Sequence, residues 1–187
     1  NYQKTKKPIK CLDIGTGANC IYPIIGNREY GWQFVATDID KTALESTQHI
    51  LDRNENLTLN SAIELKLQHN KSAIFEGIIQ ENDYFDCTMC NPPFHESAQQ
   101  AAIGSTRKVR NLKQTNIKNV TLNFGGQANE LWCEGGERQF LKNMITESVL
   151  FATNVGWFTS LVSKQENIIP SLELIKKIGA KESRIVP

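Results

Sequence analysis

The sequence predicts an α/β fold built on a mostly parallel, doubly wound sheet. Short apolar segments with the pattern of buried strands alternate with helical patterns, which is typical of parallel strands joined by crossover helices. A glycine-rich turn follows the first strand and acidic residues follow the second, at the positions where α/β proteins bind nucleotide-like ligands. The length of 187 residues and the hydrophobic fraction of 40% suit one domain with a buried core.

Four strands are expected in the first half of the chain. They cover residues 8–14, 32–37, 63–67 and 84–90. The helix after the first strand should stop near Gly26, and the next should span residues 41–54 with Asp40 as its cap. Residues 72–79 are expected to form a third, short helix. Two prolines directly after Cys90 end the fourth strand.

The second half begins with a long segment without periodicity, residues 95–133. Insertions of this length in a compact domain are usually functional or disordered. Beyond it we expect, in chain order, a helix, a strand, a helix and a last strand. Their ranges are 137–151, 157–162, 168–178 and 183–186. The prediction is therefore a single domain over residues 1–187, with six strands and an insertion.

The formal charge of +1 conceals a segregation of charge along the chain. Nine basic residues and no acidic residue lie in segments 1–10 and 104–118, so the rest of the chain carries −8. This pattern is typical of a protein that touches a polyanion locally, and two solvated segments are the alternative. The candidate contacts with a nucleic-acid backbone in the second segment are Arg107, Lys108, Arg110 and Lys113.

Five cysteines make an odd number without the dense spacing of a secreted disulfide framework, so we expect a reduced, cytoplasmic compartment. Cys87 and Cys90 form a CxxC, but within a strand these positions point to opposite faces. We therefore expect packing cysteines and no metal site. No apolar run reaches the roughly 18 residues that a membrane-spanning helix needs.

The turn after the first strand reads Asp13-Ile-Gly-Thr-Gly-Ala-Asn19. Its glycines let a ligand approach the backbone, and Asp38 follows Gly17 by 21 residues, about where an acid that binds ribose hydroxyls lies. Cys20 stands where a dinucleotide fingerprint has its third glycine, which argues against a nicotinamide or flavin cofactor. Glycines that merely make a tight turn are the alternative.

The most specific signal is Asn91-Pro-Pro-Phe94, directly after the fourth strand. It matches the motif of methyltransferases that modify a planar nitrogen, such as adenine N6, cytosine N4 or a glutamine amide. An exocyclic amine is a poor nucleophile because its lone pair is delocalised into the ring. The Asn91 side-chain oxygen and the Pro92 carbonyl would accept both amine hydrogens. Pro92 and Pro93 would stiffen the loop, and Phe94 would stack on the base.

Nearly the whole chain resembles the bacterial 23S ribosomal RNA adenine-N6-methyltransferases of the RlmF type. The resemblance rests on the segments Leu12–Gly26, Cys90–His95, Asn123–Gln127, Glu130–Glu137 and Trp157–Ser163. It implies a Rossmann-like class I methyltransferase fold and S-adenosyl-L-methionine as the cofactor. It also implies an adenine of 23S ribosomal RNA as the target, in free RNA or in a large-subunit assembly intermediate. We expect a monomer without a metal or a membrane partner.

The resemblance assigns site residues position by position. It implies cofactor contacts at Gly15, Gly17, Asn19, Asp38, Ser72 and Asn91. It implies catalytic roles for Asn91, Pro92, Pro93 and Phe94. Longer family members carry an additional N-terminal region and end in a strand hairpin, so we expect a fragment with six of the usual seven strands.

Two alternatives stay open. A protein glutamine methyltransferase of the release-factor type usually ends this motif in Tyr, where this chain has Phe94. A non-catalytic RNA-binding module on a methyltransferase fold is opposed by the intact Gly15, Asp38 and Asn91. Separately, the two glycines of Trp132-Cys-Glu-Gly-Gly-Glu137 precede a predicted helix, so we interpret this segment as a helix start, with a phosphate or substrate contact as the alternative.

Overall fold

A computed structural model describes residues 7–54, 59–93 and 133–186. The chain divides into two compact units. The sheet unit comprises residues 1–90 and 150–160, and the helical unit comprises residues 91–149 and 161–187. The expected single domain with an insertion stays a prediction, because most of that insertion lies outside the described residues. In the described part of the chain, no helix has the length and apolar character needed to cross a membrane.

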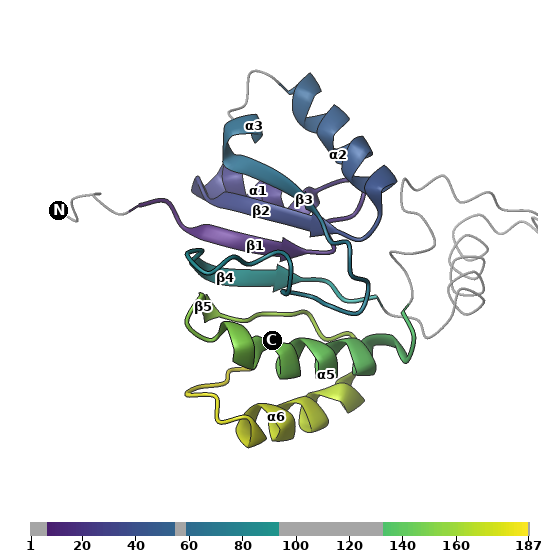
Figure 1. Ribbon diagram of the computed structural model, residues 1–187, viewed down its shortest axis with the longest axis vertical. Coiled ribbons are helices and arrows are strands. Elements are labelled where there is room, and N and C mark those ends of the chain that lie inside the picture. The colour runs from purple at the N-terminus through teal and green to yellow at the C-terminus, as the bar shows by residue number, and fades with distance from the viewer. Residues whose placement is uncertain (1–6, 55–58, 94–132, 187) are drawn as a thin grey trace, which may run out of the picture. The chain divides into compact units, whose positions relative to one another are not determined.

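The sheet unit contains five strands in the order β3-β2-β1-β4-β5, and every neighbouring pair is parallel (Figure 1). The strands are β1 Lys10–Ile14, β2 Gln33–Asp38, β3 Ile63–Leu67, β4 Phe85–Cys90 and β5 Val155–Trp157. From β1 the chain builds the sheet outward through β2 to β3, and then returns to add β4 on the other side of β1. The strand order therefore reverses between β1 and β4, where open α/β sheets bind their ligands. The predicted α/β class with a mostly parallel sheet is confirmed.

The core of the sheet unit lies along β1 and β2. Leu12, Phe34 and Ala36 are almost completely buried, as expected for central strands covered on both faces. Cysteines take part in this packing. The Cys87 thiol of β4 donates to the Cys11 sulfur of β1 across a distance of 3.6 Å.

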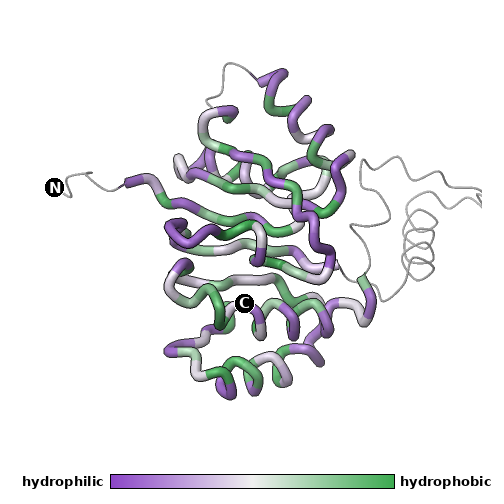
Figure 2. Tube along the Cα trace, viewed as in Figure 1, coloured by the Kyte–Doolittle hydropathy of each residue, from purple (hydrophilic) through white to green (hydrophobic). Residues whose placement is uncertain are grey.

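Three helices accompany the strands of this unit. They are α1 Ile21–Tyr30, α2 Lys41–Arg53 and the short α3 Leu59–Ala62. The Asp40 carboxylate accepts a hydrogen bond of 2.8 Å from the Thr42 backbone N–H, so the predicted cap of α2 is confirmed. Helix α2 carries both polar and apolar residues (Figure 2), and four of its residues are buried. These are Ala43, Leu44, Thr47 and Leu51.

The prediction that α1 stops near Gly26 is wrong. The helix continues to Tyr30 and ends at Gly31, whose φ of 67° is the left-handed conformation that glycine adopts at helix ends. At Gly26 a Cβ atom would lie 2.4 Å from Cζ of the buried Phe34 ring. Gly26 therefore allows α1 to pack closely against β2. From the sequence alone, a glycine needed for close packing cannot be told apart from a glycine that ends a helix.

Three further predictions differ from the structure. Residues 72–79 form turns instead of a helix. The strand expected at 157–162 is the shorter β5, which ends at Trp157. Residues 183–186 form no strand, so the described sheet has five strands and not six. An apolar run such as Ile185-Val186 predicts a strand only when a neighbouring strand accepts its backbone hydrogen bonds, and a single sequence does not reveal that neighbour.

The helical unit is built on two helices, α5 Gly136–Ser148 and α6 Ile168–Lys177, which pack against each other. A short 3-10 helix, η3 Gln165–Asn167, leads into α6. Another 3-10 turn, η2 Val149–Phe151, continues from α5 and carries the chain from this unit into the sheet unit. Both helices were predicted, to within a few residues at their ends.

Candidate active site

The polar candidates follow the carboxyl ends of aligned strands. Ile14 of β1 is paired with Thr37 of β2 on one side and with Cys90 of β4 on the other. The next residues along the chain are Gly15 and Asp38, which belong to the sheet unit, and Asn91, with which the helical unit begins. Because β1, β2 and β4 end at paired residues, the residues that follow them begin at the same edge of the sheet although they are distant in sequence.

The glycine turn is held by the end of β2. The backbone N–H groups of Gly15 and Thr16 donate to the Thr37 carbonyl at 2.9 and 2.8 Å. Gly15 has a φ of 71° and Gly17 a φ of 65°, conformations that favour glycine. A Cβ atom at Gly15 would meet nothing within 4 Å, so the turn leaves open space where a side chain would otherwise stand.

Asp38 joins the glycine turn to the start of α2. Its Oδ2 accepts from the Gly17 N–H at 2.9 Å, and its Oδ1 accepts from the Asp40 N–H at 2.8 Å. Burial raises the pKa of this carboxyl group above its ordinary value. Because a carboxylate has about four acceptor positions, the two oxygens retain capacity for ligand hydroxyls.

Asp13 adds a second buried acid to the turn. Its side chain is 1% exposed, and Oδ2 has no hydrogen-bond partner among the described residues. Burial raises the pKa of Asp13 to about 6. An unpartnered buried carboxylate is costly, so this position suits a cationic or hydrogen-bond-donating ligand.

Two polar residues that support the turn were missed by the sequence analysis. The buried Thr47 of α2 donates its hydroxyl to the Gly17 carbonyl at 3.0 Å. Gln68 follows β3, and its backbone N–H donates to the Asp38 carbonyl at 2.8 Å. A polar residue on the apolar stripe of a helix is the signal that would have found Thr47, whereas the pattern around Gln68 carries no comparable signal.

Ser72 and Asn19, both predicted to contact a cofactor, are exposed. Ser72 lies in the loop after β3, where its backbone N–H donates to the Asn70 side chain at 3.0 Å. The Asn70 N–H in turn donates to Gln68 Oε1 at 2.9 Å. These contacts define the shape of the loop, and a cofactor contact at Ser72 stays a prediction.

Asn91 has a buried side-chain oxygen, Oδ1, without a hydrogen-bond partner among the described residues. The next residue, Pro92, is buried, and Pro93 is half-buried. An unpaired buried acceptor costs about 1 to 3 kcal/mol unless a ligand satisfies it. The predicted residues Phe94, Arg107, Lys108, Arg110 and Lys113 lie outside the described residues.

The strand end that precedes Asn91 is fastened within the sheet unit. The Thr159 N–H donates to the Thr88 hydroxyl at 2.9 Å, and the Thr159 hydroxyl donates to the Thr88 carbonyl at 2.6 Å. Thr88 is completely buried. Strand β5 ends at Trp157, but these bonds link the following residues to β4. They therefore hold the last residues of β4 in place.

In the helical unit, Glu137 forms a polar centre that the sequence analysis interpreted only as part of a helix start. Its side chain is 0% exposed and accepts hydrogen bonds from the Ser163 N–H, the Ser163 hydroxyl, the Lys164 N–H and the Asn167 amide. Burial alone would raise the pKa of Glu137, but these hydrogen bonds hold it below the ordinary value. All four acceptor positions are occupied, so Glu137 fixes the 163–167 segment against the first turn of α5.

The described residues contain no group of three or more His, Cys, Asp or Glu side chains that could hold a metal ion. Within the sheet unit, the turn after β1 and the end of β2 instead present the carboxylate oxygens of Asp13 and Asp38. This set suits a ligand that carries positive charge and donates hydrogen bonds.

Comparison with known proteins identifies the family. A family model described as RNA methyltransferase matches residues 1–186. The chain belongs to this family. Ribosomal RNA large subunit methyltransferase F from Bacteroides thetaiotaomicron is 50% identical over 186 residues, which cover 100% of this chain and 60% of the relative. The protein of the same name from Vibrio campbellii is 46% identical over 196 residues, covering 95% of this chain and 50% of the relative. The chain thus spans between half and three fifths of these relatives.

Solved structures share the fold of this RNA methyltransferase family member. The hMettl16 catalytic domain in complex with MAT2A 3'UTR hairpin 6 has a TM-score of 0.72 and 28% identity, with 94% of this chain and 57% of that chain covered. The N-terminal domain of human METTL16 in complex with SAH has a TM-score of 0.68 and 24% identity, with 97% and 56% covered. The Rossmann-like class I methyltransferase fold is thereby confirmed.

Proposed function

We propose that this chain is the catalytic part of an enzyme that methylates the N6 amine of an adenine in 23S ribosomal RNA, with S-adenosyl-L-methionine as the methyl donor. The observation that carries the proposal is the buried Oδ1 of Asn91, which has no hydrogen-bond partner among the described residues and directly follows the strand that pairs with β1. The name of the curated relatives supports ribosomal RNA as the substrate. We further propose that the enzyme acts in the cytoplasm as a monomer.

The residues of the sheet unit fit the proposed cofactor. Its sulfonium and ammonium groups are positively charged and would be balanced by the buried carboxyl groups of Asp13 and Asp38. Asp38 retains acceptor capacity for the ribose hydroxyls. The open space at Gly15 lets the ligand lie close to the backbone. Further proposed contacts come from Gly17, Asn19, Ser72 and Asn91.

Asn91 would act by positioning the amine that receives the methyl group. Its side-chain oxygen and the Pro92 carbonyl would accept the two amine hydrogens, which draws the nitrogen lone pair out of the ring and aims it at the methyl carbon. Because these acceptors are already desolvated, little reorganisation is needed when substrate binds. Pro93 limits the loop to few conformations, and Phe94 would stack on the base.

Methyl transfer to deproteinised large-subunit ribosomal RNA tests the proposal. The full-length protein and labelled cofactor should yield N6-methyladenine in the nuclease digest, and Asn91→Ala should yield far less. Methylation of a release factor in place of RNA would identify a glutamine methyltransferase. Absence of cofactor binding in calorimetry, with RNA binding intact, would identify a non-catalytic RNA-binding module.

A further inference from the structure

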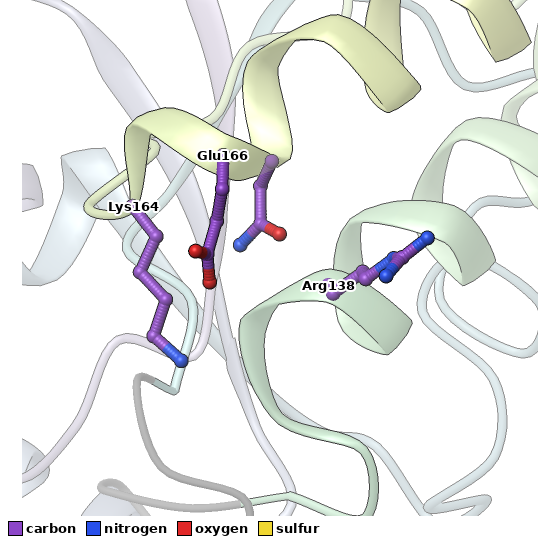
Figure 3. Close-up of a pocket in the computed structure, with 4 residues that line it drawn as sticks. Arg138, Lys164 and Glu166 are labelled. Carbon is purple, nitrogen blue, oxygen red and sulfur yellow. The ribbon is translucent and has the colours of Figure 1, made fainter.

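The helical unit contains a polar pocket that the proposed methyl transfer does not use. It has a volume of about 320 Å³ and is lined by Arg138, Lys164, Glu166 and Asn167, all from this one unit (Figure 3). The volume is at the lower end of the roughly 300 to 1,000 Å³ typical of small-ligand sites. Figure 3 shows Arg138 on α5, and Lys164 and Glu166 on the segment that leads into α6. Two elements thus contribute to one polar site.

The two cations of the pocket are available for a ligand. Arg138 is exposed and Lys164 is half-buried. In the described parts of the chain, neither side chain has a carboxylate partner within salt-bridge distance. Elsewhere, exposed lysines such as Lys41 do have such partners. Figure 3 shows the charged ends of the two side chains directed to opposite sides of the pocket, so both would turn inward to hold one phosphate. An arginine and a lysine that line one pocket without a carboxylate partner among the described residues suit a phosphate group.

Glu137 holds the backbone around this pocket in place. Its buried carboxylate holds the backbone N–H of Lys164 at 3.1 Å and the side-chain amide of Asn167 at 2.6 Å. Glu137 directly precedes Arg138 in α5, so one carboxylate fixes both walls of the pocket. A site whose backbone is fixed before binding loses less conformational entropy when the ligand arrives.

Glu166 adds a hydrogen-bond acceptor to the pocket. A carboxylate beside two cations would repel a second phosphate, but it accepts a hydrogen bond from a hydroxyl group. In RNA the ribose 2′-hydroxyl lies close to the backbone phosphates and is absent from DNA. The combination of two cations, a carboxylate and an amide therefore matches one phosphate and its ribose.

We propose that this pocket binds a phosphate–ribose unit of the RNA backbone, with the phosphate at Arg138 and Lys164 and the 2′-hydroxyl at Glu166. This inference rests on the proposed RNA substrate and adds a backbone subsite that distinguishes RNA from DNA. Glu137 is a positioning residue of the subsite. Base identity is not read there, because phosphate and sugar are common to all nucleotides.

Binding of oligoadenylate to the full-length protein, measured by fluorescence anisotropy against salt concentration, tests the phosphate half. The double variant Arg138→Gln and Lys164→Gln should bind more weakly and lose about 1.4 from the slope of log K against log salt, since each contact with single-stranded nucleic acid contributes about 0.7. The control is Lys176→Gln with Lys177→Gln, which removes the same charge from the exposed end of α6 and should leave the slope unchanged. Equal losses in both double variants, or none in the first, would overturn the phosphate assignment.

The ribose half is tested by comparing oligoadenylate with oligodeoxyadenylate of equal length. Glu166→Gln should reduce the preference for RNA over DNA severalfold, and an unchanged preference would overturn this half.

Methyl transfer to large-subunit ribosomal RNA separates the two proposals. If the wild type methylates RNA while the pocket variants leave binding unaltered, only the pocket assignment fails. If the wild type neither binds nor methylates RNA, the proposed function fails and the pocket assignment fails with it.

Discussion

The side-chain oxygen of Asn91 is buried without a partner among the described residues. A structural role and a functional role for this oxygen therefore predict different effects of its removal on stability and on catalysis. Asn91→Ala should lower kcat about a hundredfold or more, near 3 kcal/mol of barrier, by analogy with loss of an oxyanion-hole donor. Removing an acceptor that is unpaired among the described residues relieves its desolvation cost, so the loss of Oδ1 should not lower the free energy of unfolding. Single-turnover methyl transfer and urea unfolding measure the two effects.

The control for this substitution is Asn82→Ala, in the exposed turn before β4. It should leave both kcat and stability unchanged. The affinity of Asn91→Ala for the cofactor should stay within a few-fold of the wild-type value, because most proposed cofactor contacts belong to other residues. A loss of cofactor affinity as large as the loss of kcat would contradict the acceptor role.

Asp13 makes the stability of the fold depend on pH. Its pKa of about 6, against an ordinary 3.8, means that between about pH 4 and 6 the folded chain keeps a proton that the unfolded chain has released. The free energy of unfolding therefore falls as pH rises through this range, by about 3 kcal/mol from this group. Asp13→Asn cannot ionise and should lack this fall. Urea unfolding of both proteins at pH 4 and pH 7 measures the difference, and parallel pH profiles would contradict it.

The packing of α1 on β2 depends on Gly26. Alanine favours a helix over glycine by about 1 kcal/mol, but a methyl group here would lie 2.4 Å from Cζ of the buried Phe34 ring. Overpacking of a core costs about 1 to 3 kcal/mol, so Gly26→Ala should destabilise the fold. Adding Phe34→Leu should return part of the loss, which a double-mutant cycle by urea unfolding would detect. Stabilisation by Gly26→Ala would show that the helix can shift away from β2.

Elements that depend on local chemistry were predictable from the sequence, and elements that depend on distant partners were not. The cap at Asp40 and the presence of strands β1 and β2 follow from local pattern. The role of Gly26 depends on Phe34, and the length of β5 depends on how far its backbone pairs with β4. A strand at 183–186 requires a neighbour that the sequence does not identify.

The same division holds for the candidate site. The sequence singles out Gly15, Asp38 and Asn91 as proposed ligand contacts because glycine turns, acids and an Asn-Pro-Pro segment at strand ends have few other uses. Residues that hold the backbone in place were missed, as Thr47 at the glycine turn and Glu137 at the 163–167 segment illustrate. Their side chains bond to backbone groups whose location is set by tertiary structure, so their roles appear only after the chain has folded.

Across the whole molecule, charge separates into acidic and basic regions. Segments 1–10 and 104–118 contain nine basic residues and no acidic one, while the rest of the chain carries −8. Because the rest of the chain carries a net negative charge, binding of a polyanion should depend on a small number of cations. Affinity should then respond steeply to loss of those cations and little to loss of others.

Replacing Arg107, Lys108 and Arg110 by alanine should therefore weaken RNA binding uniformly across sequences. Three lost phosphate contacts should reduce the slope of log K against log salt by about 2, because each contributes about 0.7 with single-stranded RNA. The matched control replaces Lys176, Lys177 and Lys181, which lie at or beyond the end of α6 and are exposed. Both triple variants lower the net charge by three, so a difference between their salt-dependence slopes would come only from local contact with RNA. Equal slopes for the two variants would mean that net charge, and not these three side chains, governs RNA binding.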